Sequence, residues 1–331
     1  MTPRTVAIVG ATGEVGAELL AVLAERAFPI RRLRLFASPR SAGAVRSFGG
    51  ETLPVEPLGP DSFRGCELAL FSAGSAVARE HAPRAVAAGA VVVDNSSAFR
   101  RDPAVPLVVP EVNAAALAGQ RGLIANPNCA TILLVLTLAP LQQAAGVAAV
   151  VVATYQAASG AGARALAELR AGTAAALRGE PFAPAALPQA LAFNLFPQVD
   201  QFAADGYTRE EDKLQFETRR ILGLPDLPVE ATCVRVPVER CHSEAVAVRL
   251  TRPLPPAAAR ALFTGAPGLE VVDEPAVARY PMPTTSSGRD AVAVGRIRAS
   301  RIWDHGLAYW LVGDQLRKGA ALNAVQIAER L

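Results

Sequence analysis

The sequence predicts an α/β protein with two domains, a doubly wound parallel sheet followed by an α+β domain with a mixed sheet. Three observations carry this prediction: strand and helix signals alternate through the first hundred residues, three glycines stand between the first strand and the first helix, and the pattern changes near Ala148. With 331 residues and 51% hydrophobic content, the chain is large enough to bury two cores.

The first domain is recognised by its alternating pattern. The expected strands are Val6–Val9, Arg34–Phe36, Leu68–Phe71 and Val91–Asp94, and the expected helices are Val15–Ala27 and Ala76–Ala88. Strands separated by helices in this order form a parallel sheet with helices on both faces, which is the Rossmann-like arrangement.

A glycine-rich turn, Gly10-Ala11-Thr12-Gly13-Glu14-Val15-Gly16, joins the first strand to the first helix. Its G-x-x-G-x-x-G spacing lets the backbone approach a pyrophosphate at the helix N-terminus, so we expect a dinucleotide site. After the second strand, Ser38, Arg40 and Ser41 stand where an enzyme specific for NAD holds the ribose with an acidic residue. These side chains favour the 2′-phosphate of NADP; a structural turn and an ordinary polar loop are the alternatives.

A cysteine begins the longest apolar stretch of the chain. Asn126-Pro127-Asn128-Cys129 leads into Ile132-Leu133-Leu134-Val135-Leu136, which predicts a buried helix with Asn128 as its cap and Cys129 on its first turn. Unpaired backbone N–H groups and the positive end of the helix dipole stabilise a thiolate there, so Cys129 is the candidate nucleophile. The alternative is a small buried side chain beside a capped helix.

From about Ala148, strands are separated by longer polar or proline-rich connections. The expected strands are Val150–Thr154, Glu230–Pro237, Glu244–Thr251 and Ala291–Ile297. Residues 179–188 are expected to form a loop, and Gly319–Leu331 an amphipathic helix that returns to the first domain. The expected domains are therefore residues 1–126 completed by 319–331, and residues 127–318.

Composition narrows the functional classes. The net charge is only +3 and the arginines are scattered, so no basic stripe for a nucleic acid is expected. The start of the chain lacks the ordered regions of a secretory signal, and the apolar run from Cys129 to Leu141 is shorter than the roughly 18 residues of a membrane span. The four cysteines have no metal-type spacing. We expect a cytoplasmic protein with small-molecule partners, and no metal, membrane or nucleic acid.

The order of motifs along the whole chain resembles that of the bacterial aspartate-semialdehyde dehydrogenase family. The motifs are the glycine turn Gly10–Gly16, Asp94–Arg100 (DNSSAFR), Pro110–Asn113 (PEVN), Asn126–Cys129 (NPNC), Tyr155–Gly162 (YQAASGAG), Glu210–Lys213 (EEDK), Arg235–Val238 (RVPV), Cys241–Ser243 (CHS) and Leu316–Asn323 (LRKGAALN). So many motifs in one order are specific to a family.

The resemblance implies reversible reductive dephosphorylation of L-aspartyl 4-phosphate to L-aspartate 4-semialdehyde with NADP(H), a step in lysine, threonine and methionine synthesis. It implies that the Cys129 thiolate expels phosphate and forms a thioester, which hydride then reduces. By the same resemblance, His242 is the candidate acid/base and Gln156 orients the thiol side.

The resemblance also implies the binding residues. Arg235 should hold the α-carboxylate and Glu210 the α-ammonium of the substrate. The other expected substrate-binding residues are Arg100 and Lys213, for the phosphate, and Asn128. The expected cofactor-binding residues are Gly10, Thr12, Gly13, Glu14, Val15, Ser38, Arg40, Ser41, Ser72, Ala73, Gly74, Ser159, Gly160 and Asn323. A homodimer formed through the catalytic domains is expected as well, so the second domain is expected to serve catalysis and dimerisation.

Three features are particular to this sequence. Cys241 stands where many relatives have glycine, and Gln315 stands where asparagine is usual; both touch expected active-site loops, and Gln315 could alter the nicotinamide contacts. The only two lysines, Lys213 and Lys318, both lie in the family motifs of an otherwise arginine-rich chain. This suggests that a compact ammonium is needed at Lys213.

Three other functions fit the sequence less well. An N-acetyl-γ-glutamyl-phosphate reductase shares the overall plan, but its acylated substrate has no α-ammonium and would not need Glu210 beside Arg235. A short-chain reductase would need a Tyr-x-x-x-Lys pair, which the sequence lacks. A non-catalytic nucleotide-binding paralogue would not need Cys129, Gln156 and His242 together.

Overall fold

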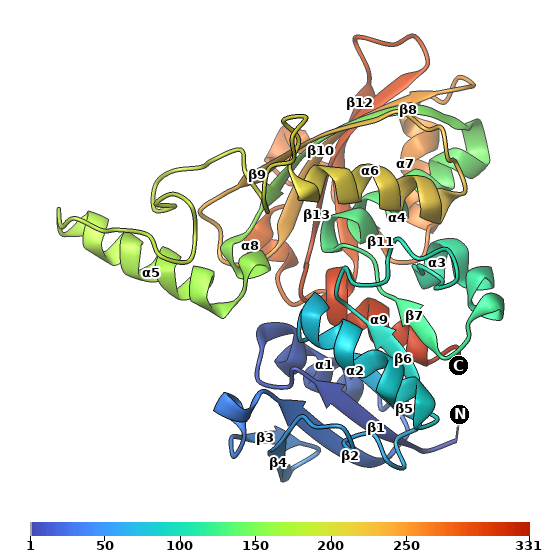
Figure 1. Ribbon diagram of the computed structural model, residues 1–331. Helices are drawn as coiled ribbons and strands as arrows, with labels where there is room; N and C mark the ends of the chain where they lie inside the picture. Colours follow the sequence, from blue (N-terminus) through green and yellow to red (C-terminus); the bar gives the residue numbers. More distant parts are fainter. Residues whose placement is uncertain (1) are drawn as a thin grey trace. The chain divides into compact units, whose positions relative to one another are not determined.

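The computed structural model describes residues 2–331, and the chain divides into two compact units. The first unit runs to Asn128 and takes up the chain again at Gly319–Leu331, and the second unit is Cys129–Lys318. This boundary after Asn128 lies two residues beyond the expected one at 126. Each unit is built around its own sheet (Figure 1).

The first unit contains a seven-stranded sheet in the order β3-β4-β2-β1-β5-β6-β7. Its strands are β1 (Arg4–Val9), β2 (Ile30–Ala37), β3 (Val45–Phe48), β4 (Glu51–Pro57), β5 (Leu68–Phe71), β6 (Val91–Asp94) and β7 (Leu123–Ala125). All neighbours pair in parallel except β3 with β4. The expected parallel sheet is confirmed, with an added edge hairpin whose turn is Gly49-Gly50, at φ of +59° and +85°.

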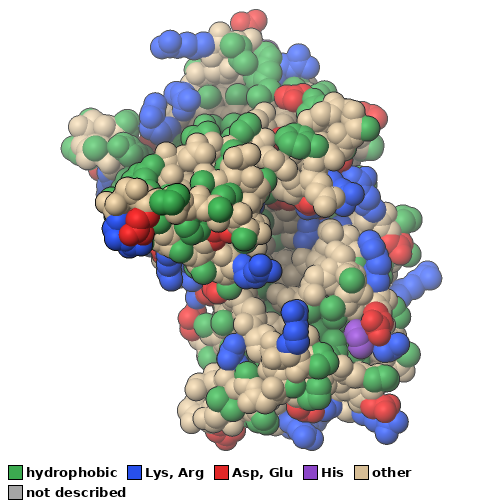
Figure 2. All heavy atoms as spheres, turned by 60° about the vertical axis from the view of Figure 1, so that its left-hand side comes forward, with side chains coloured by type: hydrophobic (Ala, Val, Ile, Leu, Met, Phe, Trp, Pro, Cys, Tyr) green, Lys and Arg blue, Asp and Glu red, His purple; other side chains and the backbone are tan. Residues whose placement is uncertain are grey.

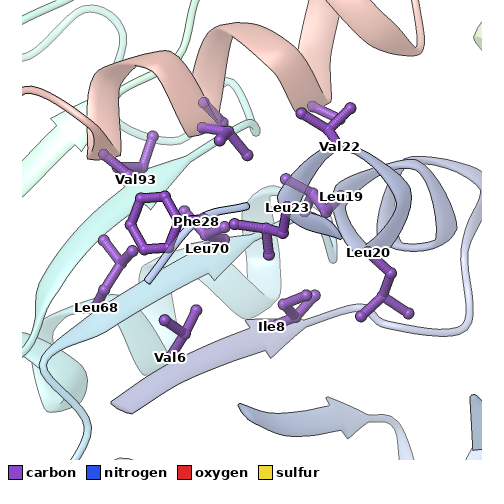
Figure 3. Close-up of a cluster of buried hydrophobic side chains, with 14 of the residues drawn as sticks. Val6, Ile8, Leu19, Leu20, Val22, Leu23, Phe28, Leu68, Leu70 and Val93 are labelled. Atoms are coloured by element: carbon purple, nitrogen blue, oxygen red, sulfur yellow. The ribbon is translucent and has the colours of Figure 1, made fainter. Parts of the chain in front are cut away.

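Helices cover both faces of this sheet, so it is doubly wound as expected. The helices are α1 (Glu14–Glu25), α2 (Ser75–Ala87), the short α3 (Pro110–Asn113) and α9 (Leu322–Ala328). Val6 and Ile8 of β1 share one core with residues of α1 and α9, and Figure 3 shows these strand residues beneath α1. Ala7 and Val9 point the other way and share a core with α2. The central strands β1 and β5 are mostly apolar because both faces are covered.

The C-terminal helix differs from the amphipathic helix expected over Gly319–Leu331. A π-helical turn, Arg317–Ala321, comes first, and α9 ends at Ala328. Every residue of α9 except Gln326 is buried, so the expected amphipathic character is wrong. The alanines allow close packing in the core of the first unit, and the buried Asn323 is accommodated because its amide is hydrogen-bonded.

The second unit contains a six-stranded sheet in the order β11-β12-β13-β10-β8-β9. Its strands are β8 (Val147–Gln156), β9 (Val229–Arg235), β10 (His242–Leu250), β11 (Leu269–Val271), β12 (Val292–Ala299) and β13 (Gly306–Gly313). The pairs β8–β9 and β11–β12 are parallel and the other pairs are antiparallel. The expected mixed sheet is confirmed.

The helix that begins at the cysteine lies in the core of the second unit. The helices of this unit are α4 (Cys129–Ala145), α5 (Ala163–Leu177), α6 (Arg209–Leu222), α7 (Pro256–Gly265) and α8 (Pro283–Ser286). α4 contacts the sheet, α6 and α7, which is why it is apolar on all sides. Gly313 leaves room for it, because a Cβ there would lie 2.5 Å from Leu133 Cδ2. The prediction that Cys129 opens a buried helix is confirmed.

The two faces of this second sheet differ in exposure. Thr154 and Gln156 of β8 lie on the face covered by helices and are buried. Val151 lies on the opposite face and is 41% exposed. On that open face Tyr155 contacts Trp310 with ring centroids 5.3 Å apart. The open face is therefore an apolar surface that the chain itself covers only in part.

Residues 2–331 contain neither a candidate membrane span nor a candidate metal centre. No helix among them is long and apolar enough to cross a membrane. No group of three or more His, Cys, Asp or Glu side chains in this range is arranged to hold a metal ion. On the face shown in Figure 2, lysine and arginine side chains are spread among acidic and apolar ones.

Candidate active site

The glycine turn of the first unit has no room for side chains at two of its positions. Gly10 has a φ of +90°, and a Cβ added to it would lie 2.4 Å from Ser72 O. A Cβ on Gly16 would lie 2.3 Å from Gly10 O. Gly13 precedes α1, and no side chain caps the first N–H groups of that helix. This backbone cradle fits a pyrophosphate, since its donors are N–H groups at a helix start.

A second glycine precedes a helix at the end of the neighbouring strand. β1 and β5 pair in parallel, so both end at the same edge of the sheet. Ser72 and Ala73 follow β5, and Gly74, at φ +83°, comes directly before α2 without a side-chain cap. The structure thus brings Ser72 and Ala73 next to Gly10, and Gly74 follows them directly in the chain.

The turn after β2 carries the residues expected at the ribose phosphate. Ser38 precedes the 3-10 turn Pro39–Ser41, and Arg40 in that turn is exposed. β2 pairs in parallel with β1, so this turn follows the same edge of the sheet as the glycine turn. Arg46 of β3 donates from Nη2 to Thr12 O at 3.3 Å. The sequence did not indicate this residue, because the hairpin that carries it was not expected.

Asn323, an expected cofactor residue, makes its observed hydrogen bonds within the first unit. Its Nδ2 donates to Asn126 Oδ1 at 2.6 Å and to Val108 O at 2.9 Å. Asn126 Nδ2 donates in turn to Asn95 Oδ1 at 2.9 Å. These bonds hold the segment that leads to Asn128, so Asn323 supports the turn that ends the first unit.

The first unit also holds two of the expected substrate residues. Arg100 is 7% exposed and donates from Nη2 to Asn95 O at 2.7 Å. Asn128 is buried and is the last residue before α4. Both therefore lie on segments that follow the carboxyl ends of β6 and β7, the edge where the strands of this parallel sheet present their ligands.

In the second unit, a capping box fixes the start of α6. Thr208 N donates to Glu211 Oε2 at 2.6 Å, and Glu211 N donates to Thr208 Oγ1 at 3.4 Å. Glu211 Oε1 also accepts from Cys233 N of β9, at 2.8 Å, which ties the helix to the sheet. The first turn of α6, with Glu210 and Lys213, is thereby placed firmly.

Glu210 connects two other expected site residues, Gln156 and Lys213. It is 5% exposed; its Oε1 accepts from Gln156 Nε2 at 3.2 Å and its Oε2 accepts from Lys213 Nζ at 3.0 Å. Lys213 Nζ also donates to Asp200 Oδ2 at 2.7 Å, a partner that the sequence did not indicate. Burial lowers the pKa of Lys213, but Glu210 and Asp200 outweigh it and raise that pKa, so the ammonium persists.

Arg235 is a buried cation at the end of β9. Its Nη1 donates to Ala157 O at 2.7 Å. Burial lowers the pKa of its guanidinium, and electrostatic interactions with Glu210 and Cys129 partly oppose this. Cys129, half-buried at the first turn of α4, therefore lies within the electrostatic reach of Arg235. The four expected residues Cys129, Gln156, Glu210 and Arg235 belong to one group.

His242 is fully buried at the start of β10. Its Nδ1 accepts a hydrogen bond from Ala157 N at 3.1 Å, and its Nε2 has no hydrogen-bond partner among the described residues. Burial, with a further contribution from Arg235, lowers the pKa of His242 to about 3. The imidazole is therefore neutral at neutral pH, with Nδ1 as the acceptor and the proton on Nε2.

Gly160, an expected cofactor residue, lies against both groups. A Cβ added to it would lie 2.8 Å from His242 Cε1 and 3.2 Å from Arg235 Nη1. No side chain fits between this backbone and the side chains of His242 and Arg235. A side chain at residue 160 would therefore displace His242 or Arg235.

Comparisons with known proteins identify the family of this chain. Two family models match the chain: the NAD binding domain of semialdehyde dehydrogenase over residues 5–120, and the dimerisation domain of semialdehyde dehydrogenase over residues 138–318. Relatives named aspartate-semialdehyde dehydrogenase are 50% identical over 330 residues in Aquifex aeolicus, covering 98% of this chain and 97% of that protein, and in Synechocystis, covering 100% and 98%.

Solved structures give the same result. Aspartate semialdehyde dehydrogenase II from Vibrio cholerae, complexed with ASA, has a TM-score of 0.97 at 43% identity and covers 100% of this chain and 98% of its own. The enzyme from Candida albicans, solved with NADP, has a TM-score of 0.78 at 26% identity, covering 100% and 98%. Identity of this extent, with the group formed by Cys129, Glu210 and Arg235, shows that the chain belongs to the aspartate-semialdehyde dehydrogenase family of oxidoreductases.

Proposed function

We propose that this chain catalyses the reversible, NADP(H)-dependent reductive dephosphorylation of L-aspartyl 4-phosphate to L-aspartate 4-semialdehyde through a thioester on Cys129. The observation that carries the proposal is that Arg235 and Glu210 are both buried and interact electrostatically, with Cys129 also within the electrostatic reach of Arg235. A substrate with one α-carboxylate and one α-ammonium matches a buried guanidinium and a buried carboxylate.

The covalent step belongs to Cys129. In the biosynthetic direction its thiolate attacks the acyl carbon, a C–S bond forms, the C–O bond to phosphate breaks, and phosphate leaves. The nearby guanidinium of Arg235 favours the thiolate over the thiol. Bound NADPH supplies the hydride that reduces the thioester. The resulting oxyanion then expels the Cys129 thiolate and leaves the aldehyde.

His242 acts in this proposal as a hydrogen-bond donor to the developing oxyanion. Because Ala157 N–H occupies Nδ1, the Nε2 atom carries the proton of the neutral imidazole and is buried without a protein partner. Its low pKa disfavours an imidazolium. An oxyanion that collapses by expelling the thiolate needs no proton, so donation from Nε2 is sufficient. This refines the acid/base role expected from the resemblance.

Substrate recognition distinguishes this function from its runner-up. An N-acetylglutamyl phosphate has an amide in place of the α-ammonium. The buried carboxylate of Glu210 would then have no cationic partner on the substrate. Glu210 already accepts from Gln156 and Lys213, so it is fixed before the substrate arrives. This arrangement favours the free amine of an aspartyl substrate.

Lys213 and Arg100 are the proposed phosphate ligands, with Asn128 beside the nucleophile in sequence. The Lys213 ammonium fits between the carboxylates of Glu210 and Asp200, and a compact group suits that space better than a planar guanidinium. This supports the idea that the sparing use of lysine in this chain is functional at residue 213.

NADP is the proposed form of the cofactor. The glycine turn supplies backbone donors for the pyrophosphate, and Arg40 is exposed after β2 in a turn without a carboxylate. Arg46 is a second cation near the turn, since it bonds to Thr12 O. Both cations support the binding of a 2′-phosphate.

A homodimer in the cytoplasm is the proposed working form. The match to a dimerisation domain over residues 138–318 and the partly exposed apolar face around Val151 support pairing through the second unit. The purified protein should then elute as a dimer in size-exclusion chromatography with light scattering.

The direct test is NADPH formation by the purified chain with aspartate 4-semialdehyde, phosphate and NADP. Parallel reactions replace the aldehyde by N-acetylglutamate semialdehyde and NADP by NAD. Phosphate-dependent turnover with the first set is expected. Turnover only with the acetylated aldehyde would move the chain to the runner-up function, and no turnover with any set would favour a non-catalytic paralogue.

A further inference from the structure

A closed circuit of hydrogen bonds surrounds His242, and Gln315 completes it. Gln315 is 2% exposed and follows β13. Its Oε1 accepts from Cys241 N at 2.7 Å, and its Nε2 donates to Ser159 Oγ at 2.7 Å. Cys241 is the residue directly before His242, and Ser159 lies two residues after Ala157, which bonds to the imidazole. The amide of Gln315 therefore links the segment before His242 to the segment whose Ala157 N–H bonds to the imidazole.

The Ser159 side of the circuit is tied to the loop before the histidine. The Ser159 hydroxyl donates to Glu239 O, and its backbone N–H donates to the same oxygen at 3.3 Å. Ala158 N donates to Val238 O at 2.8 Å. The Ser159 hydroxyl is thus occupied on both its donor and acceptor sides, by Glu239 and Gln315. Within the second unit, these bonds make it part of the support for Ala157 and the imidazole.

The Cys241 side holds an unusual backbone. Cys241 has a φ of +76°, a left-handed conformation that side chains other than glycine rarely adopt, and it is fully buried. In this conformation its N–H meets Gln315 Oε1. The bond therefore secures a strained residue immediately before His242.

The backbone of Gln315 is itself fixed by its neighbour Asp314. Asp314 Oδ1 accepts from Leu316 N at 3.0 Å and from Arg317 N at 3.3 Å. Asp314 Oδ2 accepts from Arg240 Nε at 2.6 Å and from Gly288 N at 2.7 Å. With the backbone held on both sides, the length of the side chain at residue 315 decides whether the amide reaches its two partners.

We propose that Gln315 is a positioning residue that holds the imidazole of His242 in the orientation and tautomer needed to donate from Nε2. The two departures from the family pattern, at residues 241 and 315, are then one unit: a strained cysteine backbone and an amide long enough to secure it. This proposal rests on the proposed function, because the hydrogen-bond circuit matters only if His242 stabilises the oxyanion of that reaction.

The main test is Gln315→Asn, which shortens the side chain by one methylene. We expect kcat to fall about 10- to 100-fold, because a catalytic group displaced by about 1 Å loses on the order of 10²-fold in rate. The KM values for the aldehyde and phosphate should stay within about twofold, since Arg235, Glu210 and Lys213 are untouched. Gln189→Asn, at an exposed position, is the matched control.

Two further variants keep the proposal testable if Gln315→Asn folds poorly. Ser159→Ala removes the hydroxyl that accepts from Gln315, so kcat should fall. Adding Cys241→Gly to Gln315→Asn should recover several-fold of the lost kcat, because glycine adopts a positive φ without strain. A rise in the NADP dissociation constant with unchanged kcat would instead make Ser159 a cofactor contact.

A spectroscopic measurement separates this inference from the function itself. The chain has only three histidines, so ¹⁵N-histidine NMR can resolve His242, with His242→Asn providing the assignment. The wild type should show protonated Nε2 and unprotonated Nδ1, and Gln315→Asn should shift both resonances toward a tautomer mixture. Unchanged resonances and unchanged kcat would overturn the role of Gln315, whereas loss of phosphate-dependent turnover in the wild type would overturn only the proposed function.

Discussion

The two units build their sites in opposite ways. The first unit has the glycine turn, and the second has the His242 site, which consists of Gln156, Glu210, Arg235 and His242. The turn is made of backbone: a Cβ on Gly10 would collide with the backbone of Ser72, and a Cβ on Gly16 with that of Gly10. The His242 site is made of buried side chains that come from β8, α6, β9 and β10. A ligand meets N–H groups in the first and charged groups in the second.

This difference has an energetic side. The turn contains no buried charge, and its cost is the positive φ of Gly10, which glycine tolerates. The His242 site carries a guanidinium whose pKa is lowered by burial and a strained cysteine backbone. Strain and desolvation are therefore stored at the proposed site of the chemistry. Changes in the turn should alter cofactor affinity, and changes in the His242 site should alter turnover.

The largest expected effect is that of Cys129→Ala. Removal of the nucleophile should lower kcat by at least about 10³-fold. Binding of NADP, measured by fluorescence titration, should be unchanged because the glycine turn belongs to the first unit. Cys66→Ala, in the first unit, is the control and should keep its turnover. Turnover near the wild-type level in Cys129→Ala would contradict the thioester mechanism.

A matched pair of glycine variants tests the comparison directly. Gly10→Ala places a Cβ against Ser72 O at a positive φ, so the NADP dissociation constant should rise at least about 10-fold. Gly160→Ala pushes on His242 and Arg235, so kcat should fall about 10- to 100-fold.

Gly10→Ala should leave kcat nearly unchanged, and Gly160→Ala should leave the NADP dissociation constant nearly unchanged. Gly119→Ala is the control, because nothing lies within 4 Å of its Cβ. If Gly160→Ala mainly weakened NADP binding, residue 160 would belong to the cofactor side, as the resemblance first implied.

The two regions also differ in how far the sequence predicts them. The glycine turn is local, so its spacing, the strand before it and the helix after it indicate its structure together. Cys129 is similar, because the apolar run behind it predicts a buried helix. The resemblance brought Glu210 and Arg235 into the site, but their contacts with Gln156 and Ala157 join residues far apart in the chain. No local pattern contains such pairs.

Two failures of the sequence analysis have the same cause. The edge hairpin of β3 and β4 was not expected, and Arg46 beside Thr12 was missed with it. The amphipathic reading of the last helix assumed that a C-terminal segment keeps one face in water, whereas α9 is enclosed by the core of the first unit. In both cases tertiary packing decided what local composition left open.

A smaller effect is expected at the ribose end of the cofactor. Arg40→Ala should raise KM for NADP about 10-fold and leave KM for NAD unchanged, since only NADP has the 2′-phosphate. The kcat with saturating cofactor should not change. Arg32→Ala, an exposed arginine at the other end of β2, is the control. Equal effects on NADP and NAD would show that Arg40 does not contact the 2′-phosphate.

The smallest effect on activity concerns Glu244, which lies two residues after His242 on β10. It is fully buried, and neither carboxylate oxygen has a hydrogen-bond partner among the described residues. Burial raises its pKa well above the usual value, and the titratable groups that interact with it are Cys233 and Tyr309. The folded protein therefore keeps the proton of Glu244 at a pH where the unfolded chain has lost it.

The sign of the resulting pH dependence follows from linkage. Above the unfolded pKa of about 4.5, the folded state binds one more proton than the unfolded state, so Glu244 lowers the free energy of unfolding as pH rises, by up to about 1.4 kcal/mol per pH unit. Glu244→Gln removes this slope, so its stability relative to the wild type should increase from pH 5 to pH 8 with kcat nearly unchanged.

Urea unfolding followed by tryptophan fluorescence measures this stability in the second unit, because both tryptophans, Trp303 and Trp310, lie there. Glu51→Gln removes an exposed carboxylate as the control. If the free energies of unfolding of Glu244→Gln and the wild type changed with pH in parallel, burial of Glu244 would have no energetic cost. The contrast drawn between the two regions would then be wrong for the His242 region.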